Sequence, residues 1–589
     1  MRVLRACIRG SKFPTVGHQR CPLKNVFVLG AVLGFTMVSA CSSNSRKGGA
    51  GFDLSHHGDG FALDDAGNVI TDDGGFDPGD GGSMTHDPTT CAEAATSKSY
   101  IGCDYWPTVT ANAVWSVFDY AVVVSNPGST TVNVTVSGGA LSAPKTAMVP
   151  PGQLTYIALP WVPQLKGKDA DSLGRPTPLT ASVYAAKGAY HLVADAPVLV
   201  YQFNALEYKA GTGNDLNGTP WSSCPASGSS CKSYSNDASL LLPSTAMTDN
   251  YVITGLSGDD FNGSPYDASY AVITATADAT TVIVQLSATA DLIASSGNTK
   301  IPKTSRNKNT PAKVTFTLDA GDVLELLTSN GSTYDLTGSI VQSTAPVQII
   351  VGNACTSNPN DGMSTCDHIE ETVLPVQTWG KQYVVTGPTG PNGDKPGHTV
   401  RIYGGIADST LTYTPAVSGA PTTVKAGTVT QFDTATDFVV SGTTEFVVSS
   451  EQKSGDIVDP PNQQQQLGLE AYDPQGDPSL SFMVAVPQYR DKYLFLAPTD
   501  YATSFVDVVM PDGTTLTLDG AAVTQGVAFV GGGFSVVRIP LSGGNNGAHT
   551  LTGTAPFGIQ VVGYGSQTSY QYPGGLDLKV ISNAPPPIN

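Results

Sequence analysis

The sequence predicts an all-β protein, with tandem immunoglobulin-like β-sandwich modules that follow a signal peptide and a disordered linker. Beyond residue 90, apolar and polar residues alternate with period two, and Val, Thr, Ile and Tyr predominate. Gly, Asn, Asp and Pro interrupt this alternation about every 8–12 residues, which is the strand-and-turn spacing of β-sandwiches. No apolar stripe of helical period reaches a useful length, so helical classes are excluded.

The charge balance narrows the possible partners. Charged residues make up only 13% of the 589 residues, so the chain is not a charged disordered tail. The first 40 residues contain six basic and no acidic residues, which leaves 24 basic against 49 acidic residues in the remainder. Because an acidic surface repels phosphate backbones, the sequence predicts no nucleic acid partner.

Residues 1–40 predict a lipoprotein signal peptide. Basic residues precede an apolar run, Val26 to Val38, that is too short to span a bilayer permanently. The following Ser39-Ala40-Cys41 resembles a bacterial lipobox, in which the cysteine is lipidated. We therefore expect a lipid on Cys41 that attaches the protein to a membrane, and a surface-exposed bacterial outer membrane lipoprotein. The alternative is an ordinary cleavage site beside an incidental cysteine.

Residues 41–90 predict a disordered tether. Asp and Gly are abundant there, and no periodic apolar pattern is present. Such a segment would hold the folded part away from the membrane.

The six cysteines that follow the tether fall into three local pairs. These pairs are Cys91 with Cys103, Cys224 with Cys231, and Cys355 with Cys366. An exported chain with an even number of cysteines is expected to form disulfides, and the wide gaps between pairs favour local pairing. Zinc is the rival interpretation, but the spacing and the histidine partners of a zinc site are absent.

Short signatures recur along the chain and predict internal repeats. An apolar residue and a proline precede a tyrosine in three cycles, as Leu242-Pro243 before Tyr251, Leu374-Pro375 before Tyr383, and Val486-Pro487 before Tyr493. Each cycle closes with a strand after a small turn, at Ala196-Pro197-Val198, Ala345-Pro346-Val347, Thr444-Glu445-Phe446 and Ala555-Pro556-Phe557. These signatures predict four modules at 91–209, 236–356, 368–454 and 479–580, each the size of a sandwich of about seven strands.

One acidic constellation is a candidate calcium site. It consists of Asp361, Asp367, His368, Glu370 and Glu371, next to the predicted Cys355–Cys366 bridge. Carboxylate oxygens suit Ca²⁺, which is the only cofactor that the sequence suggests. The alternative, which we favour, is a solvated junction loop whose carboxylates accept backbone N–H groups.

A cluster of tyrosines near the C-terminus is a candidate ligand contact. Tyr564, Tyr570 and Tyr572 belong to a residue type that forms rigid, amphipathic contacts at binding sites. Tyrosines are equally suited to filling a core.

No catalytic residues are predicted. The sequence contains no G-x-S-x-G, H-E-x-x-H or P-loop motif, and the histidines of the modules are scattered. The chain is therefore not expected to be an enzyme. A secreted hydrolase would need a histidine and a carboxylate that converge from distant positions.

Several segments resemble the amino-terminal domain of the IgG-Fc-binding, mucin-associated proteins, a domain that also occurs in bacterial surface lipoproteins. They are Leu374 to Tyr383, Ser343 to Val347, Tyr201 to Asn204, Cys366 to Glu371, and Tyr570 to Leu576. The resemblance covers most of residues 91–580 and implies an extracellular, β-rich binding or adhesion module. It does not imply antibody binding, and the cysteine-rich von Willebrand-type repeats of the animal proteins are absent.

The sequence therefore predicts a lipid-anchored cell-surface binding or adhesion protein. Its repeated modules would present several weak contacts to an extracellular protein or glycan ligand, and these contacts would add as avidity. The alternative function is a structural envelope or matrix scaffold that acts by self-association.

Overall fold

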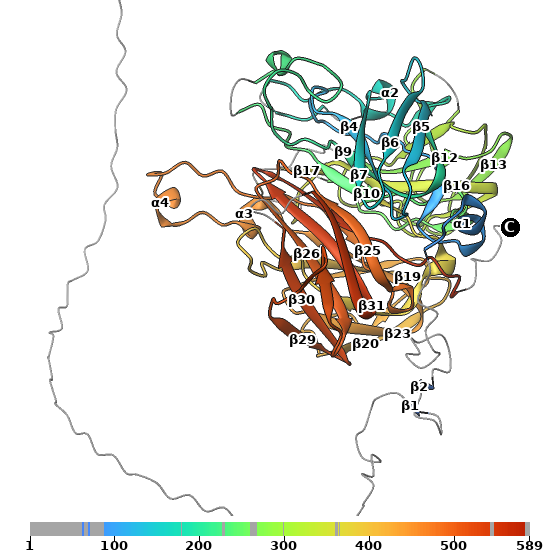
Figure 1. Cartoon of the computed structure of the whole chain (residues 1–589). Helices are drawn as coiled ribbons and strands as arrows, with labels where there is room; N and C mark the ends of the chain where they lie inside the picture. Colours follow the sequence, from blue (N-terminus) through green and yellow to red (C-terminus); the bar gives the residue numbers. More distant parts are fainter. Residues whose placement is uncertain are drawn as a thin grey trace, which may run out of the picture. The chain divides into compact units, whose positions relative to one another are not determined.

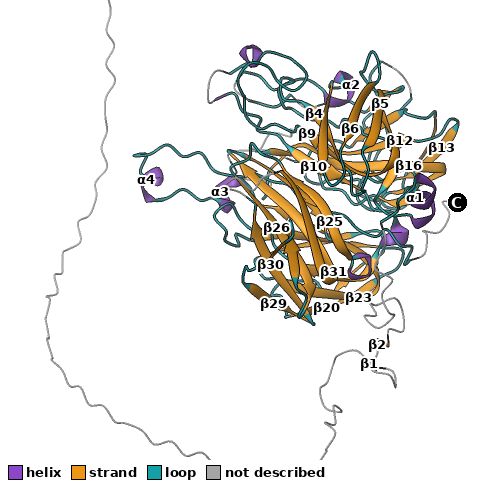
Figure 2. Cartoon of the chain, in the orientation of Figure 1, coloured by secondary structure: helices purple, strands orange, loops and turns teal. Residues whose placement is uncertain are grey.

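Antiparallel sheets dominate the chain (Figure 2), which confirms the all-β class. The computed structural model describes residues 62–63, 69–70 and 87–582, apart from 173, 178, 227–229, 260–267, 298–299, 360–362, 364–365 and 542–546. Helices in these residues are short. They are α1 (Cys91–Ser97), α2 (Pro163–Lys166), α3 (Gly455–Val458) and α4 (Gln463–Gln466), with single 3-10 turns at Trp221–Ser223, Val376–Thr378 and Val486–Gln488.

Four large sheets follow one another along the chain. Sheet 1 contains β3 (Gly102–Tyr105), β4 (Tyr120–Ser125), β5 (Val132–Gly138), β6 (Lys145–Val149), β7 (Leu154–Leu159), β9 (Tyr190–Asn204) and β10 (Asp237–Leu240). Sheet 2 contains β8 (Val183–Ala185), β11 (Thr248–Val252), β12 (Ser269–Ala275), β13 (Thr280–Gln285), β14 (Lys313–Leu318), β15 (Val323–Leu327), β16 (Ile340–Thr356) and β17 (Asp367–Thr372).

The two later sheets repeat this arrangement. Sheet 3 contains β18 (Gly380–Val385), β19 (His398–Gly404), β20 (Ser409–Thr414), β21 (Thr423–Val424), β22 (Val429–Thr434), β23 (Phe438–Gln452) and β24 (Leu480–Phe482). Sheet 4 contains β25 (Arg490–Ala497), β26 (Thr503–Pro511), β27 (Leu516–Leu518), β28 (Ala521–Ala522), β29 (Val527–Gly531), β30 (Phe534–Pro540), β31 (Gly547–Gly565) and β32 (Thr568–Pro573). A separate pair is formed by β1 (Ala62–Leu63) and β2 (Val69–Ile70).

Each sheet is organised around one long strand that pairs with different neighbours along its two halves. In β9, residues up to Ala194 pair with β5, and residues from Leu199 pair with β4. The sequence Ala196-Pro197 lies at this changeover. Because proline has no N–H to donate, it suits a position where one ladder ends and the next begins. The equivalent long strands are β16, β23 and β31, so the small turns expected before each closing strand lie within these strands.

The last strand of each of the first three modules lies outside the range that the sequence predicted for that module. The strand β10 was assigned to the module that begins at residue 236, yet it pairs with β9 of sheet 1. In the same way, β17 pairs with β16 and β24 pairs with β23. Each Leu-Pro or Val-Pro signature therefore follows the last strand of a module and joins it to the next. A further exchange comes from β8, which leaves the first module and pairs with β15 of sheet 2.

The four modules pack against one another, because residues Gly60–Asn589 form one compact unit. The four last strands, β10, β17, β24 and β32, are called the hub strands here. Contacts link β10 to β17, β17 to β24, β24 to β32, and β32 back to β10. One continuous apolar cluster also contains residues of sheet 1, such as Val122 and Tyr201, together with residues of sheet 4, such as Val508 and Phe557. The first module thus packs directly on the last.

A buried carboxylate ties the hub strands together. Asp237, on β10, is fully buried and accepts backbone N–H groups from Glu370 on β17 (3.2 Å), Leu480 on β24 (3.3 Å) and Gln571 on β32 (3.2 Å). Those N–H groups have no water to bond to, so an acceptor at this point replaces a sheet partner. The side chain of one residue thus holds three strands that follow it by 130 residues or more.

Candidate binding cleft

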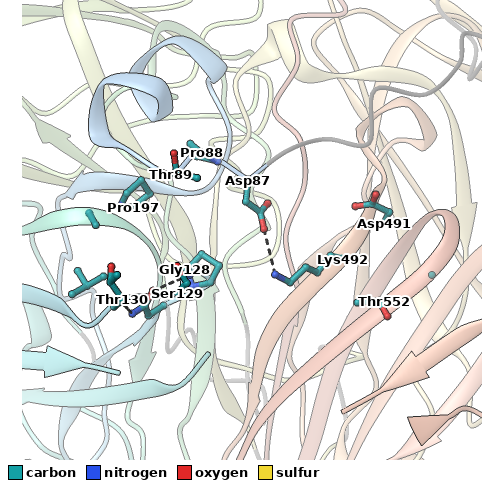
Figure 3. Close-up of a pocket in the computed structure, with 15 residues that line it drawn as sticks. Asp87, Pro88, Thr89, Gly128, Ser129, Thr130, Pro197, Asp491, Lys492 and Thr552 are labelled. Carbon is teal, nitrogen blue, oxygen red and sulfur yellow. Dashed lines mark hydrogen bonds and ion pairs between the residues drawn. The ribbon is translucent and has the colours of Figure 1, made fainter. Parts of the chain in front are cut away.

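A cavity of about 510 Å³ lies between the first and last modules, and we call it the seam cleft. Figure 3 shows the residues that line it. One wall comes from the chain around Asp87, from the turn after β4 and from the bend of β9. The other wall comes from β25 and β31. The lining residues are Asp87, Pro88, Thr89, Asn126, Pro127, Gly128, Ser129, Thr130, Val132, Ala196, Pro197, Asp491, Lys492, Thr552 and Gly553.

The turn that forms one side of the seam cleft is held rigidly. The side-chain amide of Asn126 donates to the carbonyl oxygens of Thr130 (2.7 Å) and Val149 (2.9 Å). Its Oδ1 accepts the backbone N–H of Gly128 (2.9 Å). With the three prolines of the lining, these bonds make a preformed surface that loses little conformational entropy on binding.

Charged groups on the other side of the cleft hold the segment around Asp87 in place. Arg490 is buried and forms ion pairs with Asp87 and with Asp577 (3.2 Å), and its guanidinium lies 5.1 Å from the ring centre of Tyr100. The pKa of Arg490 is raised, although burial opposes that shift, because Tyr100 and the two carboxylates favour the charged form. Lys492 lies at the cleft, 3.8 Å from Asp87, and is 41% exposed.

The lining of the seam cleft is mostly apolar. The fifteen residues that Figure 3 draws around the cleft include neither His nor Cys, and most of the lined surface is apolar. An apolar wall with a few fixed polar groups at its mouth is the usual composition of a recognition site. The seam cleft can therefore receive an apolar protrusion and orient it through Lys492, Asp87 and Asp491.

A second cavity of about 330 Å³ lies beside the Cys355–Cys366 disulfide. Its lining includes Trp115, Arg175, Lys232 and Tyr234. The basic groups there already have partners, since Arg175 pairs with Asp171 (3.5 Å) and Lys232 with Asp473 (2.8 Å). This cavity is also smaller than the seam cleft.

The three cysteine pairs are disulfides in the structure. Sulfur atoms join Cys91 to Cys103 and Cys224 to Cys231, in addition to the pair beside the second cavity. The first of these bridges fastens α1 to β3 and closes a loop of 12 residues.

The acidic constellation does not form the expected solvated loop. Asp367, His368, Glu370 and Glu371 lie in β17, and all four are buried, because β16 pairs with one edge of β17 and the other hub strands pack beside it. Asp361 lies outside the described residues.

The carboxylates of β17 are occupied by hydrogen-bond donors rather than directed at one cation. Glu370 accepts from Thr110 (2.9 Å), Gln202 (3.0 Å) and Asn204 (2.5 Å). Asp367 accepts the backbone N–H groups of Asn236 (2.8 Å), His368 (2.8 Å) and Ser569 (3.0 Å), and the hydroxyl of Thr568 (2.9 Å). Burial raises the pKa of Asp367 and of Glu371. Within the described residues, no group of three or more His, Cys, Asp or Glu side chains is placed to hold a metal ion, so the calcium hypothesis gains no support.

The prediction that the C-terminal tyrosines contact a ligand is wrong. Tyr564, Tyr570 and Tyr572 have no exposed surface. Their hydroxyls bond internally, Tyr564 to the carbonyl of Thr389 (2.7 Å), Tyr570 to the hydroxyl of Ser504 (3.1 Å), and Tyr572 to the carbonyl of Leu496. The physical reason is that Tyr570 and Tyr572 lie on the hub strand β32, and Tyr564 lies on β31, which pairs with β32. Tyr572 also lies against Tyr201 of the first module, with ring centres 4.8 Å apart.

Sequence reasoning did not find the residues of the seam cleft. The Asn126-Pro127-Gly128 turn and the Ala196-Pro197 bend stood out only as parts of the repeat. Nothing in the sequence indicated that Asp491 and Lys492 would face them across the contact between the first and last modules.

The four antiparallel sheets and the local disulfides define an all-β protein with a cleft between its first and last modules. Residues 237–563, more than half of the chain, match the IgGFc binding protein family, and the chain belongs to that family. A human IgGFc-binding protein is 36% identical over 72 residues, which is 11% of this chain and 1% of the human protein. The family match begins at residue 237, in the last strand of the first module, and leaves out the rest of that module, which nevertheless has the same order of its five central strands as the other three. The family is named for a binding activity.

The expected location in a bacterial outer membrane is corrected by the same comparisons. The named relative is a human protein, and it points to an extracellular protein of the eukaryotic kind rather than to a bacterial outer membrane lipoprotein. The predicted signal peptide, the lipid site Cys41 and nearly all of the tether lie outside the described residues. Among the described residues, no helix combines the length and the apolar character needed to cross a membrane.

Proposed function

We propose that the chain acts outside the cell as a protein-binding module, and that the seam cleft receives the protein ligand. The observation that carries this proposal is a preformed apolar cleft with charged groups at its mouth, in a chain of the IgGFc binding protein family. Its volume suits one or two side chains of a protruding loop, while the surfaces around it would supply the remaining contact area.

The position of the cleft supports a recognition role. Both walls are fixed, one by the Asn126 turn and the other by the Arg490 ion pairs, so that binding would not have to order a loop. Fixed walls raise affinity mainly by lowering the entropy cost of association. Apolar contacts inside and charged groups at the rim are also the usual division between the core and the rim of an interface.

The human relative is named for binding the Fc part of IgG, so the Fc fragment is the first probe. We propose the variant Ser129→Trp, because Ser129 is an exposed cleft residue and an indole at this position would fill the space. Ser418→Trp is the matched control, since Ser418 is exposed on a turn of the third module. If Fc binds in the cleft, Ser129→Trp weakens binding at least about tenfold, or ~1.4 kcal/mol, while Ser418→Trp does not.

Three results separate the alternatives. Equal binding of Fc by both variants would place the ligand elsewhere on the chain. Loss of binding after enzymatic removal of the Fc glycans would show that a glycan is the recognised group. Binding of no Fc at all by the unmodified chain would exclude this ligand, and capture from extracellular fluid with the same two variants would then test the cleft against other proteins.

We also propose that the chain acts in adhesion. A binding module that is attached to a surface would join that surface to its ligand. Attachment through a lipid on Cys41 stays a prediction from the sequence, and mass spectrometry of the mature N-terminus would test it.

A further inference from the structure

A buried lysine and a buried asparagine meet where the second and third modules join. Asn358 lies two residues after the end of β16, and Lys453 directly follows β23; both of these long strands are labelled in Figure 1. The side chain of Lys453 is 9% exposed, and Asn358 is 5% exposed. The Nζ atom of Lys453 lies 3.1 Å from Oδ1 of Asn358, so a primary amine is held against a side-chain amide.

The side-chain amide of Asn358 is fixed at both ends. Its NH₂ group donates to the backbone carbonyl oxygens of Glu451 (3.4 Å) and Gln452 (3.1 Å). Its Oδ1 accepts hydrogen bonds from Nζ of Lys453 and from the hydroxyl of Thr399 on β19 (3.1 Å). Two donors on Oδ1 make Cγ more electrophilic, and they would stabilise negative charge on this oxygen as an oxyanion hole does.

The amine of Lys453 has a carboxylate beside it. Asp433, on β22, accepts hydrogen bonds through Oδ1 from Nζ of Lys453 (2.7 Å) and from the hydroxyl of Thr399 (2.7 Å). Although burial opposes the shift, these hydrogen bonds lower the pKa of Asp433, so the group is ionised at neutral pH and can accept a proton. Its side chain is 66% exposed. Water would therefore solvate this carboxylate if the ammonium group beside it were consumed, and the loss of the ion pair would cost little.

The usual route by which an asparagine loses its amide is blocked at this position. In that route, the backbone nitrogen of the next residue attacks the side chain and a cyclic imide forms. The residue after Asn358 is Pro359, whose nitrogen carries no hydrogen and cannot form the imide. The amide of Asn358 therefore stays available to the amine of Lys453.

From these contacts we propose that Lys453 and Asn358 form an intramolecular isopeptide bond. Asp433 takes a proton from the ammonium group of Lys453, and the neutral Nζ attacks Cγ of Asn358. The bond between Nζ and Cγ forms and the bond between Cγ and Nδ2 breaks. The leaving nitrogen departs as ammonium, with one proton from Nζ and the proton that Asp433 held.

This reaction is balanced within the chain. One ammonium group and one primary amide become one secondary amide and one free ammonium ion, so neither an oxidant nor a co-reactant is needed. An amine attacks an amide very slowly in water. Contact between the two groups in a buried site supplies the effective concentration that such a reaction requires.

The bond would fasten the third module to the second. Lys453 and Asn358 are 95 residues apart, and the closed loop contains the strands β18 to β23. The third module could then not leave the second without breaking a covalent bond. Unlike the three disulfides, this amide would resist reductants. The proposal is independent of the seam cleft.

Peptide mapping of the full chain by mass spectrometry, after reduction of the disulfides, tests the proposal. We expect a branched peptide that contains Lys453 and Asn358 and is lighter by one ammonia, about 17 Da, than the two linear peptides that it joins. Lys453→Arg keeps a positive charge beside Asp433 but removes the amine, so the branched peptide should be absent from this variant.

Lys145→Arg is the matched control. The Nζ atom of Lys145 lies 2.8 Å from Oδ1 of Asn217, but Asn217 is exposed to water, so we expect no bond between them. This variant should therefore contain the same branched peptide as the unmodified chain.

Three results would overturn the proposal. The first is recovery of Lys453 and Asn358 only in linear peptides of unchanged mass, from an unmodified chain whose circular dichroism shows folded β structure; this result does not depend on the folding of any variant. The second is loss of ammonia, or a gain of about 1 Da, at Asn358 within a linear peptide, which would indicate an imide or hydrolysis. The third is a branched peptide that persists in Lys453→Arg, which would place the cross-link on another lysine.

Discussion

The hydroxyl of Tyr383 donates a hydrogen bond to the carbonyl oxygen of Phe446 (2.7 Å) and accepts the backbone N–H of Gly380 (3.0 Å). The phenol thus joins the start of β18 to the long strand β23 at its bend, where the pairing register shifts. Gly380 and Phe446 face each other in the register beside this shift, and the phenol lies between the N–H of one residue and the carbonyl of the other. Both residues are buried, so these backbone groups need a partner within the protein.

The same bridge occurs in all four modules. Tyr105 reaches Val198 (2.6 Å), Tyr251 reaches Val347 (2.9 Å), and Tyr493 reaches Phe557 (2.5 Å). The opening tyrosine and the closing motif, two signatures that are about 60 to 100 residues apart, are therefore halves of one contact. The first module has this tyrosine as well, although no Leu-Pro pair marks it in the sequence.

Removal of this bridge should destabilise the chain. We expect Tyr383→Phe to lower the free energy of unfolding by about 1–3 kcal/mol, because two buried backbone groups lose their partner. Burial raises the pKa of Tyr383, so its hydroxyl remains a donor at every pH used. Tyr156→Phe is the control, since Tyr156 is 53% exposed, and it should change stability by less than about 0.5 kcal/mol. Denaturation by urea measures both, and equal effects would contradict this role for the phenol.

Asp237 should be among the most sensitive positions of the hub. Burial raises the pKa of its carboxyl group, which accepts N–H groups from three other strands through both oxygens, whereas an amide at this place has one acceptor oxygen. We expect Asp237→Asn to cost at least about 2 kcal/mol, because buried N–H groups would be left unpaired. Asp249→Asn, at an exposed position, serves as the control. Thermal unfolding that leaves the Asp237→Asn midpoint unchanged would show that the hub does not depend on this carboxylate.

Stability should increase as the pH falls from 8 to about 6. Burial raises the pKa of Glu207 to about 8, that of Glu451 to about 7 and that of Asp507 to about 6. Each carboxyl binds a proton more tightly in the folded chain, so its contribution to stability is complete below the unfolded pKa of about 4 and is lost as pH rises through the folded value. His398 acts in the opposite direction, because burial lowers its pKa to about 4 and its contribution is lost as pH falls from about 6.5.

The variant Glu207→Gln isolates one part of this pH dependence. It should be at least as stable as the unmodified chain at pH 8, and its melting temperature should vary less between pH 6 and 8. Scanning calorimetry at several pH values tests this expectation. A melting temperature that rises from pH 6 to pH 8 in the unmodified chain would reverse the sign and refute it.

The disulfide at α1 should stabilise the first module by restricting its unfolded state. We expect the double variant Cys91→Ser and Cys103→Ser to lower the free energy of unfolding by about 2–3 kcal/mol, as loop-closure entropy predicts for 12 residues. Peptide mapping without reductant checks the pairing first. Linkage of either cysteine to Cys224 or Cys355 would contradict the local pairs.

The sequence by itself determined the all-β class, the local cysteine pairs and the fourfold recurrence of short motifs. These features depend on local chemistry, because side-chain alternation, turn residues and close cysteine spacing act within about 15 residues. The sequence predicted that the acidic segment of β17 is exposed and that Tyr570 and Tyr572 contact a ligand, but all of these residues are buried. Their packing partners are far away in the sequence, so the local pattern does not reveal the burial.

Only the tertiary structure decided where the modules exchange strands and where the seam cleft forms. The hub joins Asp237 to Gln571, and the seam cleft joins Pro127 to Lys492, so both depend on packing between segments several hundred residues apart. Such packing is selected by the total burial of apolar surface and the pairing of every buried N–H group, and neither quantity can be read from one segment alone.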